Sequence, residues 1–142
     1  MIKNFAHKIG AEVVSLQGDN DDGGTDGVIQ RPGREAKCVE ARRKGYPNHR
    51  GKVCDFPGGW NNYRLVTDGG IFLNELTIQH HKDENEDFIF LVEIKGFPPR
   101  ACYINKERTA ELLQQPHRIM GSTNSKSDQS VKTVPLNWFK KY

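Results

Sequence analysis

Residues 26–42 read DGVIQRPGREAKCVEAR, with the dipeptide Pro32-Gly33 between two segments that carry acidic residues. Pro32-Gly33 supplies a tight turn, and the flanking segments 26–30 and 34–42 are compatible with extended strands. The pattern therefore predicts an antiparallel β-hairpin centred on Gly33. In that register Asp26 lies directly opposite Glu40, and directly opposed side chains share one face of a sheet.

These two acids are the candidate metal ligands. Like charges held this close are unfavourable without a compensating cation. Carboxylate oxygens suit Mg²⁺, with Mn²⁺ as an alternative, and such a cation polarises a phosphoryl oxygen and readies a water for attack. The hairpin therefore predicts a two-carboxylate metal site, made by Asp26 and Glu40, beside a nucleic-acid phosphate.

The rest of the chain predicts both helices and strands. Helices are expected at 2–9, where Gly10 is a stop signal, and at 106–115, where Asn105 is a cap. Further strands are expected, by their β-branched and aromatic residues, at 11–16, 64–66, 71–80, 88–95 and 100–104. We expect the strands from 64 to 95 to extend the sheet in antiparallel fashion, with residues 81–87 as a turn.

Residues 2–42 resemble the PD-(D/E)xK nuclease superfamily, which includes many restriction enzymes and Holliday-junction resolvases. The resemblance is carried by a short helix, GAEVVSL at 10–16, an acidic glycine-rich loop, TDGVI at 25–29, a turn, and KCVEARRKG at 37–45. It implies a restriction-endonuclease-like α/β fold, with a mixed central β-sheet and flanking helices. It also implies that Asp26 and Glu40 bind magnesium.

Arg42 stands where the family pattern has a lysine. An arginine carries the positive charge and can stabilise a phosphate, but it does not readily lose a proton to act as a base. Transition-state stabilisation is the role that fits it, so the candidate catalytic residues are Asp26, Glu40 and Arg42. Proton transfer would then fall to a metal-bound water or to Lys44, which strand alternation places on the face of Glu40.

A basic segment follows the hairpin and is the candidate nucleic-acid interface. From Arg31 to Arg64 there are nine Lys or Arg residues against three acids, although the whole chain has a net charge of only +3. Such a segment can line a phosphate backbone or form a solvated loop face. The candidate nucleic-acid-binding residues are Arg43, Lys44, Arg50, Lys52, Trp60 and Arg64.

Other readings of the same motifs remain open. Glu93-Ile94-Lys95 also spells ExK, but its partner acid Asp68 falls out of register with Glu93. The alternative is an edge strand on which Glu93 and Lys95 are solvated. Glu35-Ala36-Lys37 lies too close to the turn to face Asp26. His80 and His81, adjacent on an expected strand, point to opposite faces and are interpreted as surface residues.

The chain as a whole predicts one domain over residues 1–142, with 121–130 as a flexible linker before a C-terminal aromatic anchor. Three widely spaced cysteines indicate reduced thiols, and no long apolar run or secretory signal is present, so a cytoplasmic protein without a membrane partner is expected.

Three functions are compatible with these patterns. The first is a magnesium-dependent endonuclease, acting as a homodimer on double-stranded or branched DNA. The second is a nuclease-fold DNA-binding module that has lost cleavage, because Arg42 replaces the lysine. The third is a protein-interaction domain that uses the loop 45–60.

Overall fold

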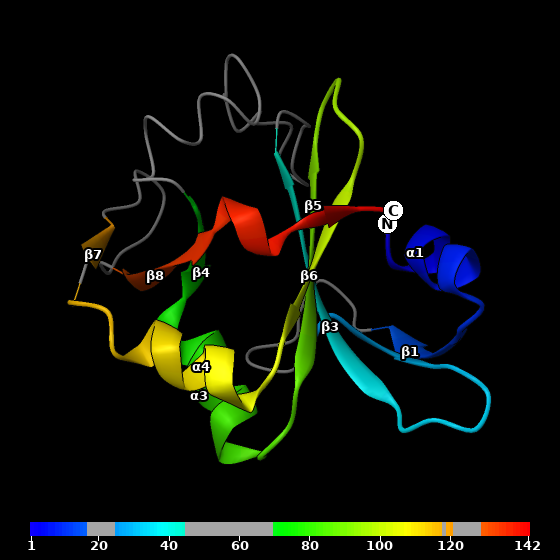
Figure 1. Ribbon diagram of the computed structural model, residues 1–142, viewed down its shortest axis with the longest axis horizontal. Coiled ribbons are helices and arrows are strands. Elements are labelled where there is room, and N and C mark those ends of the chain that lie inside the picture. Colours follow the sequence, from blue (N-terminus) through cyan, green and yellow to red (C-terminus); the bar gives the residue numbers. More distant parts are fainter. Residues whose placement is uncertain (17–24, 45–69, 118, 121–128) are drawn as a thin grey trace.

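The computed structural model describes residues 1–16, 25–44, 70–117, 119–120 and 129–142. Within these residues the fold is mixed α/β, built on a central mixed sheet (Figure 1). In sheet order, the strands of that sheet are β1 (Glu12–Leu16), β2 (Gly27–Gln30), β3 (Lys37–Lys44), β5 (Phe88–Ile94), β6 (Arg100–Ile104) and β9 (Lys140–Lys141).

The hairpin of β2 and β3 has the expected register. Gly27 pairs with Val39 and Ile29 pairs with Lys37, so the reversal is centred on Gly33. Gly33 has a φ of 70°, which favours glycine, and the amide of Arg34 donates to the carbonyl of Arg31 at 3.1 Å to close the turn. This register confirms the predicted hairpin.

The neighbour of β3 on its other side corrects one expectation. Residues 88–95 do form a strand, β5, but it runs parallel to β3, with Glu40 opposite Phe90. Only the first part of the expected strand 71–80 is extended, as β4 (Gly70–Asn74). The rest belongs to a helix, α3 (Glu75–Asp83). The antiparallel extension expected for 71–95 is therefore wrong, because β4 joins a second sheet and the chain returns through α3 to run parallel to β3. The expected strand 64–66 lies outside the described residues.

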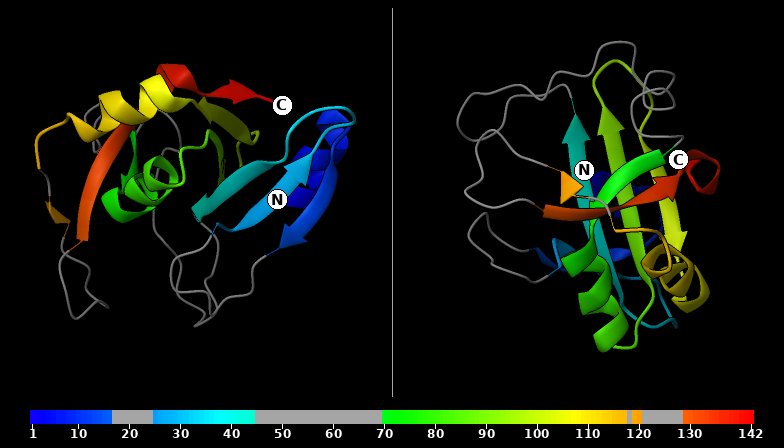
Figure 2. Two further views of the ribbon diagram at one scale, coloured as in Figure 1. Left: turned by 90° about the horizontal axis from the view of Figure 1, so that it is seen from below. Right: turned by 90° about the vertical axis from the view of Figure 1, so that its left-hand side faces the viewer.

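The central sheet has a different cover on each face (Figure 2). On one face lies α1 (Ile2–Ile9), which ends at Gly10 as predicted, with φ 72°. Its core includes Phe5, Ile29 and Val39. On the other face lie α3, α4 (Lys106–Leu113) and a second sheet.

That second sheet has the order β4, β8 (Gln129–Pro135) and β7 (Ile119–Met120). Residues 129–130 of the expected linker therefore belong to β8, and the rest of it lies outside the described residues. The turn η1 (Leu136–Trp138) then leads to Phe139, which is buried, and to Tyr142, whose ring packs 4.8 Å from that of Phe5. The last residue of the chain therefore packs against α1.

Candidate active site

Asp26 immediately precedes β2 and reaches across to β3. Its Oδ2 accepts hydrogen bonds of 2.8 Å from the backbone amide of Ala41 and 2.8 Å from Arg42 Nη1. Ala41 lies beyond the last described pair of β2 with β3, so the carboxylate takes the place of a strand partner for that amide. The hydroxyl of Thr25 donates to the carbonyl of Val39 at 2.9 Å, which fixes the same junction.

Glu40 is the buried partner of this pair. Its side chain is only 3% exposed, against 41% for Asp26. Arg42 Nη1, which lies 2.8 Å from Asp26 Oδ2, is also 3.9 Å from Glu40 Oε2. The structure therefore brings Asp26, Glu40 and Arg42 together, with one guanidinium nitrogen facing both carboxylates.

His81 completes the site and comes from α3, on the far side of Glu40. Its Nε2 lies 2.9 Å from Glu40 Oε1, and its Nδ1 lies 2.9 Å from Glu86 Oε1. The imidazole is fully buried and stacks on Phe88, with ring centroids 4.1 Å apart. The interpretation of His81 as a surface residue is wrong, because the chain is helical there and the helix turns this side chain toward the sheet.

A signal for this helix was present in the sequence. Asn74 and Glu75 suit the start of a helix, and the basic residues His80, His81 and Lys82 suit its last turn, where positive charge complements the helix dipole. Ile78 and His81, the two buried residues of α3, are three positions apart, as expected for one face of a helix.

The buried cluster holds its protons more tightly than free side chains do. Burial raises the pKa of Glu40, although the hydrogen bond from His81 opposes this. Burial alone would lower the pKa of His81, but its hydrogen bonds with Glu40 and Glu86 outweigh burial and raise it. The raised pKa of His81 favours a protonated imidazole, whereas burial works against the ionised form of Glu40.

Two sets of atoms could hold a cation. The first is Asp26 and Glu40, whose oxygens suit Mg²⁺. They fit such an ion in one respect, because the structure already balances the two acids with the positive charge of Arg42, whose side chain is about one-third exposed. No described residue donates a hydrogen bond to Asp26 Oδ1 or Glu40 Oε2, so both oxygens can accept a ligand.

The second set is Cys38, His81 and Glu86, whose ligand atoms lie within 4.8 Å of one another. Sulfur and nitrogen donors suit zinc better than magnesium. Burial raises the pKa of Cys38 to about 11, and its thiol donates to Glu86 Oε1 at 3.3 Å. Without a metal, the Cys38 thiol and His81 Nδ1 both contact the same oxygen, Glu86 Oε1.

The structure places only part of the expected nucleic-acid interface. Arg43 is half exposed, and its Nε lies 3.7 Å from Glu93 Oε2. Lys44 belongs to β3, whereas Arg50, Lys52, Trp60 and Arg64 lie outside the described residues, as does the loop 45–60. Glu93 is on β5, between β3 and β6, so the expectation of an edge strand there is wrong.

Comparisons with known proteins give this chain no relative. No protein-family model, curated protein or solved structure matches it. Within the described residues, no helix is long and apolar enough to cross a membrane.

Proposed function

We propose that this chain is a metal-dependent DNA endonuclease of the PD-(D/E)xK type, with a restriction-endonuclease-like fold and its active site at Asp26, Glu40 and Arg42. The observation that carries the proposal is a pair of carboxylates that face one guanidinium nitrogen at 2.8 and 3.9 Å, one of them buried and one open to solvent. A buried acid beside an exposed acid suits the binding of a cation at a phosphodiester, once Arg42 has left the space between them.

Each side chain has a separate task in this proposal. His81 fixes Glu40 through Oε1, which leaves Oε2 directed toward Arg42. The amide of Ala41 fixes Asp26 in the same way. Magnesium, when bound by the two acids, would supply the positive charge that polarises a phosphoryl oxygen. Arg42, once released from Asp26, would donate to the phosphate oxygens as charge develops on them.

The proposed substrate is double-stranded or branched DNA, and the proposed active form is a homodimer, because one small domain has one such site and a duplex has two strands to cut. The test compares plasmid cleavage by the wild type, Asp26→Asn and Glu40→Gln with Mg²⁺ or Mn²⁺. Both variants keep the size of the side chain and should lose at least about 100-fold in rate.

Glu93→Gln is the matched control, because it neutralises the acid of the other ExK sequence, Glu93-Ile94-Lys95, on the neighbouring strand β5. It should cut at close to the wild-type rate. Equal cleavage by Asp26→Asn, Glu40→Gln and the wild type would remove the assignment, and loss of activity only in Glu93→Gln would move the site to β5.

One observation favours a second candidate, a nuclease-fold module that binds DNA without cutting it. Arg42 Nη1 makes a 2.8 Å hydrogen bond to Asp26 and another of 2.9 Å to the carbonyl of Ala41, so the guanidinium is well held where a metal would lie. This candidate predicts salt-sensitive DNA binding without metal-dependent cleavage. Arg42→Lys should then produce cleavage, and a robustly active wild type would reject this candidate.

A further inference from the structure

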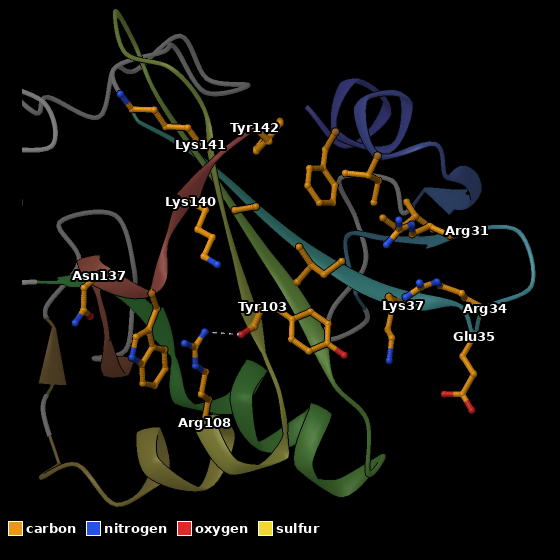
Figure 3. Close-up of a pocket in the computed structure, with 16 residues that line it drawn as sticks. Arg31, Arg34, Glu35, Lys37, Tyr103, Arg108, Asn137, Lys140, Lys141 and Tyr142 are labelled. Atoms are coloured by element: carbon orange, nitrogen blue, oxygen red, sulfur yellow. Dashed lines mark hydrogen bonds between the residues drawn. The ribbon is translucent and has the colours of Figure 1, made fainter.

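A hollow lies on the face of the central sheet opposite Glu40 (Figure 3). Strand alternation separates the two, because Lys37 and Val39 of β3 face α1, whereas Cys38 and Glu40 face α3. The hollow has a volume of about 520 Å³, a size typical of ligand sites. Apolar side chains such as Ile29, Ile89 and Ala101 also line it, so a ligand could contact apolar surface as well as charged groups.

The charge of this hollow is strongly one-sided. The Lys and Arg residues that line it number six against a single acid, Glu35, whereas the whole chain has a net charge of only +3. Lys37 is partly compensated by Asp87, whose Oδ2 lies 3.8 Å from its Nζ. The basic residues are Arg31, Arg34, Lys37, Arg108, Lys140 and Lys141.

These cations are spread along the hollow and do not converge on one point. Figure 3 shows Arg31 and Arg34 on the hairpin side, with Arg108 and Lys140 on the opposite side, toward α4 and β9. A single phosphate is bound by groups that surround one position. Cations at intervals along a path instead match a chain of phosphates.

Aromatic rings lie among these cations and are held in place. Tyr103 is 44% exposed, and its hydroxyl donates to Asp87 Oδ2 at 2.8 Å. Arg108 stacks over Trp138 with its Cζ 4.6 Å from the ring centroid, and its Nη1 donates to the carbonyl of Tyr103 at 2.9 Å. Lys37 Nζ lies 5.7 Å from the centroid of the Tyr103 ring. Preorganised rings beside cations are suited to base stacking.

We propose that this hollow binds single-stranded nucleic acid, with phosphates along the cations and an unpaired base on the ring of Tyr103. A duplex cannot present its paired bases to this ring, so the exposed aromatic surface favours a single strand. An acidic protein segment would match the charge but would leave the stacking surface unused. The proposal does not depend on cleavage, because Glu40 lies on the other face of the sheet and neither Asp26 nor Arg42 lines the hollow.

The test is fluorescence anisotropy of a labelled oligothymidylate of about 12 nucleotides, with EDTA present so that no metal-dependent reaction occurs. The double variant Arg34→Glu with Lys140→Glu should weaken binding by at least about tenfold, and wild-type binding should fall steeply with salt. The matched control is Lys82→Glu with Lys95→Glu, which changes the net charge equally at exposed residues outside the hollow. It should bind like the wild type.

A second pair of variants tests stacking separately from charge. Tyr103→Leu should weaken binding by roughly tenfold, whereas Tyr103→Phe keeps the ring and should bind like the wild type. This pair decides the outcome if the charge-reversed protein does not fold. Equal losses in the hollow and control variants, equal binding by Tyr103→Leu and Tyr103→Phe, or tighter binding of a duplex or of polyglutamate would each overturn the proposal.

Discussion

His81 Nε2 and Glu40 Oε1 lie 2.9 Å apart in the interior of the protein, joined across 41 positions of the chain. The His81 side chain is fully buried and that of Glu40 is 3% exposed. Each side chain therefore supplies the hydrogen-bond partner that water would supply at the surface. A buried carboxylate is costly unless it is paired and hydrogen bonded. This contact connects the hairpin to α3 and is the reason that Glu40 can be held in the core.

Removal of the imidazole should therefore destabilise the fold strongly. His81→Ala leaves Glu40 buried without its partner, and we expect a loss of roughly 3–5 kcal/mol in the free energy of unfolding. Urea denaturation followed by circular dichroism measures it. His80→Ala, at the partly exposed neighbouring residue of the same helix, should cost less than about 1 kcal/mol.

A double-mutant cycle separates the interaction between His81 and Glu40 from the loss of packing that His81→Ala also causes. Because Glu40→Gln removes the charge that His81 compensates, it should cost less in the His81→Ala background than alone. Strictly additive free energies would show that the two residues do not act as a pair.

The same pair predicts a fall in stability as the pH rises. The pKa of His81 is raised in the folded protein, so its contribution is fully present below the unfolded pKa and is lost as the pH rises through the folded pKa. The raised pKa of Glu40 has the same sign at lower pH. Urea midpoints should fall as the pH rises above the ordinary histidine value of about 6.5 in the wild type and change less in His81→Gln. Parallel pH profiles of the two proteins would contradict this.

The hairpin could be predicted from the sequence because it is local. Pro32-Gly33 fixes the turn, and the turn fixes the register that brings Asp26 to β3 beside Glu40. The short helix that ends at Gly10 and the helix capped by Asn105 are local in the same sense, and Asn105 Oδ1 does accept from the amide of Arg108 at 2.8 Å.

Long-range pairings could not be predicted in this way. Nothing in the residues of β3 or β5 alone specifies that they run parallel, because the direction depends on how α3 connects them. An interpretation of residues 71–80 as a strand and 81–87 as a turn gives no reason to place His81 beside Glu40. The sequence therefore identifies Glu40, the most deeply buried acid among the described residues, but not its partner His81.

Cysteine labelling tests the packing around the site. Burial raises the pKa of Cys38 to about 11 and that of Cys102 to about 12, so few thiolates exist at neutral pH. Both thiols should react with iodoacetamide at pH 8 at least about 100-fold more slowly than in urea, with Cys38 ahead of Cys102. Peptide mapping by mass spectrometry resolves each cysteine.

Glu86 is the hydrogen-bond acceptor of the Cys38 thiol, and it contributes to the raised pKa after burial. Glu86→Ala should therefore speed the labelling of Cys38 and leave Cys102 unchanged. Labelling of Cys38 in the folded wild type as fast as in urea would contradict the half-buried position and raised pKa of this thiol.

Gly70, at the start of β4, tests how the second sheet packs. Gly70 pairs with Pro135, and a Cβ added at Gly70 would overlap the backbone of Val134 and the side chain of Thr133. Backbone of a paired strand cannot move aside as the end of a side chain can, so Gly70→Ala should destabilise the protein by about 3 kcal/mol in urea denaturation. Gly96→Ala is the matched control, because a Cβ there meets open space and the cost comes only from its φ of 85°. It should cost about 1 kcal/mol, and an equal or smaller cost for Gly70→Ala would mean that β4 and β8 are not packed this closely.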